Sequence, residues 1–200
     1  MITLAPLQWG IETVLWAAGA IGCLTAMAWL QRRRGRFGAA ETALLVALGL
    51  TALWSLVGAL AGAESTAAEM GESLRNLAWI FALYRLFAMD GRLESVRPVR
   101  PLLMALAFVE VLQAASGLAL STQGISLSDG IALRSLASLR LLVAVGGLVL
   151  VHNLYAGAAQ QARLTIRWPA MALTLLWGID LNLYALAYLA GNSPAVITSA

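Results

Sequence analysis

The chain has 200 residues, of which 60% are hydrophobic and 12% charged, and its mean hydropathy is +0.81. A water-soluble domain carries roughly twice that share of charged residues, so the composition excludes an ordinary soluble protein. The formal net charge is +3 and every basic residue except the one histidine is arginine. These arginines stand mostly in short segments between apolar blocks, which indicates membrane topology and argues against nucleic-acid binding.

Six apolar blocks follow one another along the chain. A helix needs about 20 apolar residues to cross the roughly 30 Å of hydrocarbon in a bilayer. In order, the blocks occupy residues 9–30, 39–61, 73–89, 102–120, 131–156 and 168–190. We therefore predict one all-α domain over residues 1–200, a polytopic transmembrane helix bundle with six spans. The chain turns apolar again after Pro194, so a seventh span is expected in the intact protein.

The arginines predict the orientation of the bundle. The first block is followed by Arg32, Arg33, Arg34 and Arg36 and has no basic residue before it, so it is not a cleavable signal peptide. The three loops inferred to be cytoplasmic contain nine arginines, and the loops inferred to be external contain none. This asymmetry places the N-terminus outside. Segment 62–73, which carries Glu64, Glu69 and Glu72, is expected to be an external loop.

The last two blocks form a hairpin that carries unusual polar groups. It runs from Leu139 to Leu189 and includes LVHNLY at 150–155 and WGIDLNLY at 177–184. Ionisable groups inside a membrane are costly and usually face a protein interior or a watery cavity. Together with Glu110 of the fourth block, which stands at a depth similar to that of Arg140, they form the candidate sensing set: Glu110, Arg140, His152, Asn153, Asp180 and Tyr184. The set predicts either a ligand pocket or proton-linked switch, or buried ion pairs that fix the order of the helices.

The motifs of common enzymes are not found in the sequence. There is no phosphate-binding loop, no HExxH and no GxSxG, so no residue is assigned a catalytic role. One cysteine, Cys23, and one histidine, His152, do not make a metal cluster, and we predict neither a metal site nor a cofactor in this chain. Aromatic residues near the predicted helix ends are expected to be interfacial anchors: Trp9, Trp29, Trp79, Trp168 and Tyr188. The pair Gly58 and Gly62 has the spacing of a close helix contact.

Three pieces of the chain resemble the membrane region of PEP-CTERM system sensor histidine kinases of the PrsK type. They are ESLRNLAWIFALYRLF at 72–87, LVLVHNLYAGAAQQARLTIRW at 148–168 and DLNLYALAYL at 180–189. The chain departs from the pattern at His152, where an acidic residue is expected, and at Ala156, where an arginine is expected. Residues that match are Arg75, Trp79, Tyr155, Arg167, Asp180 and Tyr184, and the resemblance assigns no role to them.

The resemblance implies that the chain is the sensor and anchor of a two-component system in the bacterial inner membrane. It implies a kinase core beyond Ala200 that uses ATP and magnesium, a homodimer, and a response regulator that receives the phosphate. The lipid bilayer is the partner that the composition itself predicts. Two alternatives come from other classes: a small-molecule transporter or channel subunit, and an intramembrane enzyme.

Overall fold

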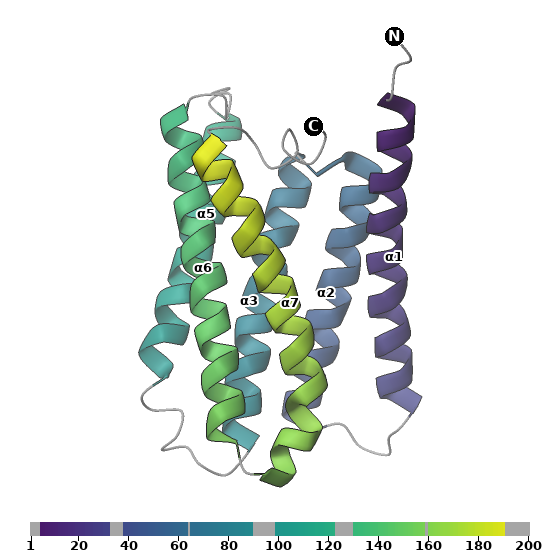
Figure 1. Cartoon of the computed structure of the whole chain (residues 1–200), viewed down its shortest axis with the longest axis vertical. Helices are drawn as coiled ribbons and strands as arrows, with labels where there is room; N and C mark the ends of the chain where they lie inside the picture. Colours follow the sequence, from purple (N-terminus) through teal and green to yellow (C-terminus); the bar gives the residue numbers. More distant parts are fainter. Residues whose placement is uncertain are drawn as a thin grey trace. The chain divides into compact units, whose positions relative to one another are not determined.

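The structure is a computed structural model that describes residues 5–32, 38–63, 65–89, 99–122, 130–158 and 160–190, and within these ranges it contains six α-helices and no strand. The helices are α1 (Ala5–Arg32), α2 (Ala39–Ala61), α3 (Thr66–Met89), α5 (Arg100–Thr122), α6 (Gly130–Gly157) and α7 (Gln160–Ala190) (Figure 1). The predicted all-helical class is therefore confirmed for the described residues. Arg33, Arg34, Arg36, Arg92 and Arg97, which helped to predict the orientation, lie outside them.

Five of the six helices are long and apolar enough to cross a membrane. They are α1, α2, α5, α6 and α7, and they mark the chain as a membrane protein. Helix α3 is not among the five, although the sequence predicted a span at 73–89. Its 24 residues include Glu69, Glu72, Arg75 and Arg85, which lower its apolar character.

The chain divides into two compact units, and the boundary lies within α3, between Ala82 and Leu83. In the first unit α1 and α2 lie side by side and antiparallel (Figure 1). Small residues let their backbones approach. A Cβ on Gly58 would lie 2.7 Å from the Trp16 ring, and one on Gly19 would lie 3.2 Å from Ser55 Oγ. Gly58 thus makes the close helix contact predicted from the sequence, whereas a Cβ on Gly62, the other glycine of the predicted pair, would meet nothing within 4 Å.

Helix α3 begins earlier than the sequence predicted. It starts at Thr66, not at Ser73, because Ser65 acts as an N-cap: its Oγ accepts a hydrogen bond from the backbone N–H of Ala68 at 3.2 Å. At the end of α2, Gly62 is the C-cap and has a φ of +86°, a value that glycine adopts readily. The expected external loop at 62–73 is therefore mostly helix, and Glu69 and Glu72 belong to α3.

In the second unit, α6 packs against both α5 and α7. Two adjacent glycines of α6 provide the contacts. A Cβ on Gly146 would lie 2.5 Å from Leu106 Cδ2 of α5, and a Cβ on Gly147 would lie 2.5 Å from the indole ring of Trp177 on α7. Since lipid tails are as apolar as these side chains, the attraction between the helices is van der Waals packing, which requires this close approach.

The start of α7 also differs from the prediction. The apolar stretch begins at Ile166, close to the predicted boundary at 168, but the helix itself begins at Gln160. Arg163 stabilises this early start, because it donates hydrogen bonds to the carbonyls of Ala156 at 2.8 Å and Ala158 at 2.9 Å at the end of α6. Pro169 consequently lies inside the helix and not in its first turn.

Candidate functional site

The first unit contains a buried polar cluster around Arg75, which we call the Arg75 cluster. Arg75 itself is 0% exposed. Its guanidinium carbon lies 4.0 Å from the centre of the Trp54 ring, and its Nε and Nη2 donate to Asn76 Oδ1 at 3.3 and 3.1 Å. The other buried polar residues of the unit are Thr51, Ser55, Glu72, Ser73 and Asn76.

Trp79 belongs to the Arg75 cluster and is not an interfacial anchor. It is buried in the middle of α3, and its Nε1 donates to Thr51 Oγ1 at 3.0 Å, which joins α3 to α2. Thr51 Oγ1 donates in turn to the carbonyl of Ala47 at 2.7 Å. Buried tryptophans usually have such a partner for their N–H. By contrast, Trp29 and Tyr188 are exposed near helix ends, and Trp168 is exposed at the start of the apolar stretch of α7, as expected for anchors.

Trp54 links the Arg75 cluster to the contact between α1 and α2. Its ring makes an edge-to-face contact with Trp16 at 4.6 Å between centroids, and a Cβ on Gly71 of α3 would lie 3.1 Å from it. The guanidinium of Arg75 therefore rests on an aromatic platform that two neighbouring helices hold in place. Cation–π contacts gain strength in surroundings that exclude water.

The sequence pattern of α3 contains a signal for this cluster. Glu72, Arg75, Asn76 and Trp79 stand at positions i, i+3, i+4 and i+7 of one helix, which places them on one face. This face was not predicted, because Glu72 was expected in an external loop and Arg75 was given no role.

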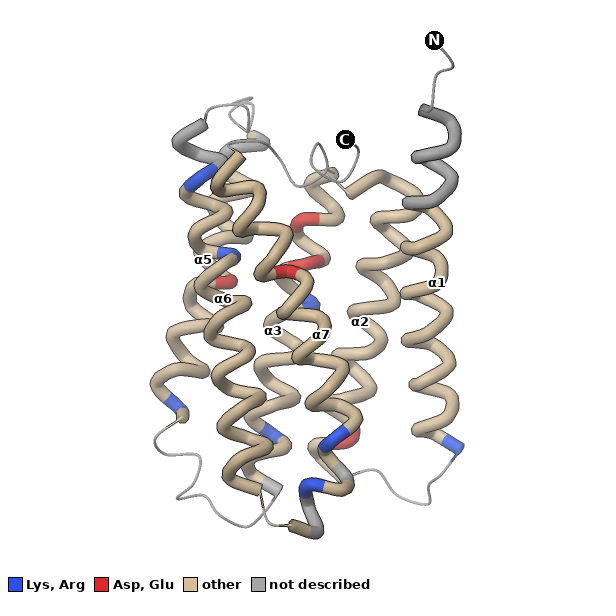
Figure 2. Tube along the Cα trace, viewed as in Figure 1, with Lys and Arg blue, Asp and Glu red and all other residues tan. Residues whose placement is uncertain are grey.

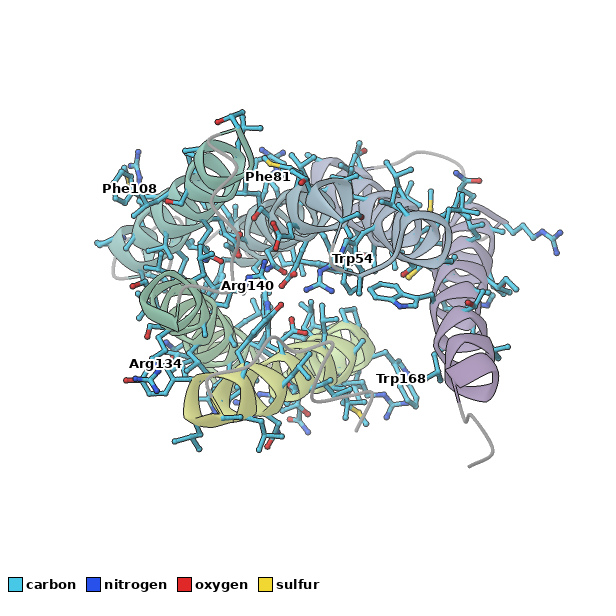
Figure 3. The ribbon with its side chains drawn as sticks, turned by 90° about the horizontal axis from the view of Figure 1, so that it is seen from above. Trp54, Phe81, Phe108, Arg134, Arg140 and Trp168 are labelled. Carbon is cyan, nitrogen blue, oxygen red and sulfur yellow. The ribbon has the colours of Figure 1, made fainter. Side chains whose placement is uncertain are left out.

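The second unit contains a polar layer that includes four of the residues predicted from the sequence. We call it the Arg140 layer: Glu110 and Gln113 of α5, Arg140 of α6, and Asp180 and Tyr184 of α7. Charged residues stand inside the helices as well as at their ends (Figure 2). Arg140 lies on the inner side of α6, whereas Arg134, about two turns earlier, points away from the helices (Figure 3).

Arg140 and Tyr184 are in direct contact. Arg140 Nη1 donates to Tyr184 Oη at 3.1 Å, and the guanidinium carbon lies 5.0 Å from the centre of the tyrosine ring. The bond joins α6 to α7. Gly147 comes seven residues after Arg140 and Trp177 seven residues before Tyr184, so this bond and the contact of Gly147 with Trp177 belong to the same antiparallel register. Both residues belong to the candidate sensing set, but the bond between them was not predicted from the sequence.

Two polar residues of α5 face the same layer. Glu110 is 1% exposed and Gln113 is 6% exposed, and both follow Leu106, which contacts Gly146, on one face of the helix. Because Leu106 lies opposite Gly146 and a helix rises about 1.5 Å per residue, Gln113 stands level with Arg140. Glu110 precedes Gln113 by three residues and therefore stands about 4.5 Å away from that level along the helix. In the described part of the chain, the side-chain nitrogen of Gln113 has no hydrogen-bond acceptor. Gln113 was not predicted from the sequence.

Asp180 lies at the border of the Arg140 layer, and the other predicted residues lie outside it. Asp180 is half-buried, one turn before Tyr184 on α7. His152 and Asn153 are exposed near the end of α6, about 18 Å along the helix from Arg140, so the structure does not bring them together with the Arg140 layer. Tyr155 and Arg167 are exposed close to the connection between α6 and α7.

Neither cluster has the composition of a metal site. Within the described ranges, no three His, Cys, Asp or Glu side chains gather in a way that could hold a metal ion. Comparison of the chain with protein-family models, with curated proteins and with solved structures gives no match.

Proposed function

We propose that the chain is the membrane sensor and anchor domain of a two-component sensor histidine kinase. The proposal combines the resemblance of segments 72–87, 148–168 and 180–189 with the buried polar residues of the two units. The kinase core would follow Ala200, and it would use ATP and magnesium to phosphorylate a histidine and pass the phosphate to a response regulator. The protein would act as a homodimer in the bacterial inner membrane.

The observation that carries the proposal is the bond between Arg140 and Tyr184. Polar groups inside a membrane bundle are expensive to bury, and a buried amide without an acceptor, as at Gln113, costs about 1–3 kcal/mol. A bundle that served only as an anchor would be more stable with apolar residues at these positions. A polar contact between two helices is a suitable two-state element, because a signal that favours the broken state shifts the equilibrium between two helix arrangements.

The proposed function includes a defined orientation of the domain in the membrane. We propose six spans with the N-terminus outside, so that α3 crosses the membrane although its sequence is less apolar than that of the other helices. The buried position of Arg75 against Trp54 supports this, since an arginine that faces protein and not lipid is tolerated within a span.

Single cysteines test the orientation. In a Cys23→Ala background, cysteine is introduced at Ser65, Ser95, Ser126 or Gly157, which lie at or between the ends of successive helices in the sequence, and intact cells are treated with a maleimide that does not cross membranes. Ser65→Cys and Ser126→Cys are expected to react, whereas Ser95→Cys and Gly157→Cys react only after permeabilisation. If α3 does not cross, the cysteines at 65 and 95 will react alike.

Signalling is tested with the full-length protein in lipid vesicles. We expect phosphorylation from ATP, and we expect Tyr184→Phe and Arg140→Gln to change the phosphorylated fraction by about tenfold, since a hydrogen bond to a charged group contributes about 1.5–3 kcal/mol. The double variant should change it no further, because both substitutions remove the same bond. Arg134→Gln, an exposed arginine of the same helix, is the matched control and should have no effect.

Two results would contradict the proposal. If the coding sequence beyond residue 200 encodes further spans and no kinase core, and vesicles take up a small solute, the transporter interpretation replaces it. If a kinase core is present but the Arg140 and Tyr184 variants signal as the wild type does, the Arg140 layer is not the sensing element.

A further inference from the structure

One end of the second unit carries a group of exposed basic and aromatic side chains. We call it the basic turn: Tyr155 at the end of α6, and Arg163, Arg167 and Trp168 on the first turns of α7. All four residues are exposed, Trp168 at 63%. Segment 156–168 contains no acidic residue, so nothing within it offsets the two positive charges.

Arg163 has a structural role in the basic turn. Its hydrogen bonds to the carbonyls of Ala156 and Ala158 satisfy acceptors at the end of α6, which would otherwise lack partners. Its guanidinium carbon also lies 5.9 Å from the centre of the Tyr155 ring. Arg163 therefore closes the connection between α6 and α7 and keeps its charge at the surface.

Arg167 is held differently. Its guanidinium carbon lies 4.9 Å from the centre of the Trp168 ring, and the side chain is exposed. Trp168 projects sideways from α7 (Figure 3). Both residues stand at the start of the apolar stretch, which begins at Ile166, and this is the depth at which lipid headgroups lie and where tryptophan is enriched.

We propose that the basic turn binds the headgroup of an anionic phospholipid. Arg167 pairs with the phosphate, because a guanidinium presents two parallel N–H groups to two phosphate oxygens. Trp168 holds the guanidinium at the level of the headgroup, and Arg163 adds positive charge from one turn away. The proposal rests on the membrane-spanning helices alone and is independent of the kinase proposal.

Lipid titration of the purified full chain in detergent tests it. The wild-type chain and Arg167→Gln are titrated with phosphatidylglycerol and with phosphatidylcholine, and bound lipid is counted by native mass spectrometry. We expect the wild-type chain to prefer phosphatidylglycerol. Arg167→Gln should weaken that binding about fivefold, the equivalent of about 1 kcal/mol for one arginine near an anionic surface. Phosphatidylcholine binding should not change.

Matched variants separate a site from general attraction. Arg134→Gln removes the same charge from an exposed position near the other end of α6 and should bind phosphatidylglycerol as the wild type does. Arg167→Lys keeps the charge but loses the planar guanidinium, and we expect a loss smaller than that of Arg167→Gln. Inorganic phosphate at millimolar concentration should not displace the lipid. Equal losses for Arg134→Gln and Arg167→Gln, no loss for Arg167→Gln, or displacement by phosphate would each overturn the proposal.

Discussion

Replacing Gly147 with leucine is expected to push α6 away from α7 and to lower the stability of the second unit substantially. A Cβ at this position would already lie 2.5 Å from the Trp177 ring, and the nearest atoms belong to the rigid indole. Trp177 is 0% exposed, so its ring has no free space into which it can move. Overpacking of a filled core typically costs about 1–3 kcal/mol, which is a large share of a total stability of about 5–15 kcal/mol.

Three glycine-to-alanine variants, compared with one another, test the Gly147 prediction. Gly178→Ala on α7 meets nothing within 4 Å and should be neutral or stabilise the helix by up to about 1 kcal/mol. Gly146→Ala meets the end of the Leu106 side chain, which can rotate, so its loss should be small. Gly147→Ala should lower the unfolding temperature the most of the three variants. Thermal unfolding followed by circular dichroism in detergent gives the order, and equal unfolding temperatures for Gly147→Ala and Gly178→Ala would show that the packing argument is wrong.

Gly147→Ala should also weaken the candidate site. Gly147 with Trp177, and Arg140 with Tyr184, share one antiparallel alignment of α6 and α7. A displacement of the helices at the glycine therefore lengthens the bond between Arg140 and Tyr184 about two turns away. Under the proposed function as a sensor kinase, this variant should change phosphorylation of the full-length protein in the same direction as Tyr184→Phe.

Replacing Arg75 with alanine is expected to destabilise the first unit by about 1.5–3 kcal/mol, the contribution of hydrogen bonds to a charged group. The substitution removes the stacking on Trp54 and two hydrogen bonds to Asn76, and it leaves a cavity in a fully buried position. The loss should appear as a lower unfolding temperature and a smaller yield of monodisperse protein in detergent.

Three further variants test the role of the Arg75 guanidinium. Arg75→Lys keeps the charge but not the planar group, and we expect it to recover only part of the lost stability. Arg85→Ala, on the same helix and half-buried, should change stability much less. In a Trp54→Leu background, Arg75→Ala should cost less by about 0.5–2 kcal/mol, because the cation–π contact is already absent. An Arg75→Ala protein as stable as the wild type would contradict this account.

The sequence alone determined the helices and four of the polar residues that make up the Arg140 layer. In hydrocarbon every backbone group must be satisfied within its own segment, so long apolar blocks become helices whatever surrounds them. Arg140 and Tyr184 were predicted as members of one polar set because an ionisable residue within a span requires a protein neighbour, whereas the bond between them was not predicted. Helix ends were less well predicted, since Ser65 and Arg163 extend α3 and α7 through local hydrogen bonds that hydropathy does not register.

Only the tertiary structure decided which polar residues are buried and what they contact. Packing of α3 against α2 made Arg75 and Trp79 interior residues, and the register set by Gly146 and Gly147 placed Gln113 level with Arg140. His152 and Asn153 stand in the same apolar block as Arg140 yet are exposed. Between membrane helices there is no general hydrophobic drive, so the fit of small and large side chains selects the faces that meet, and that fit depends on residues far apart in the sequence.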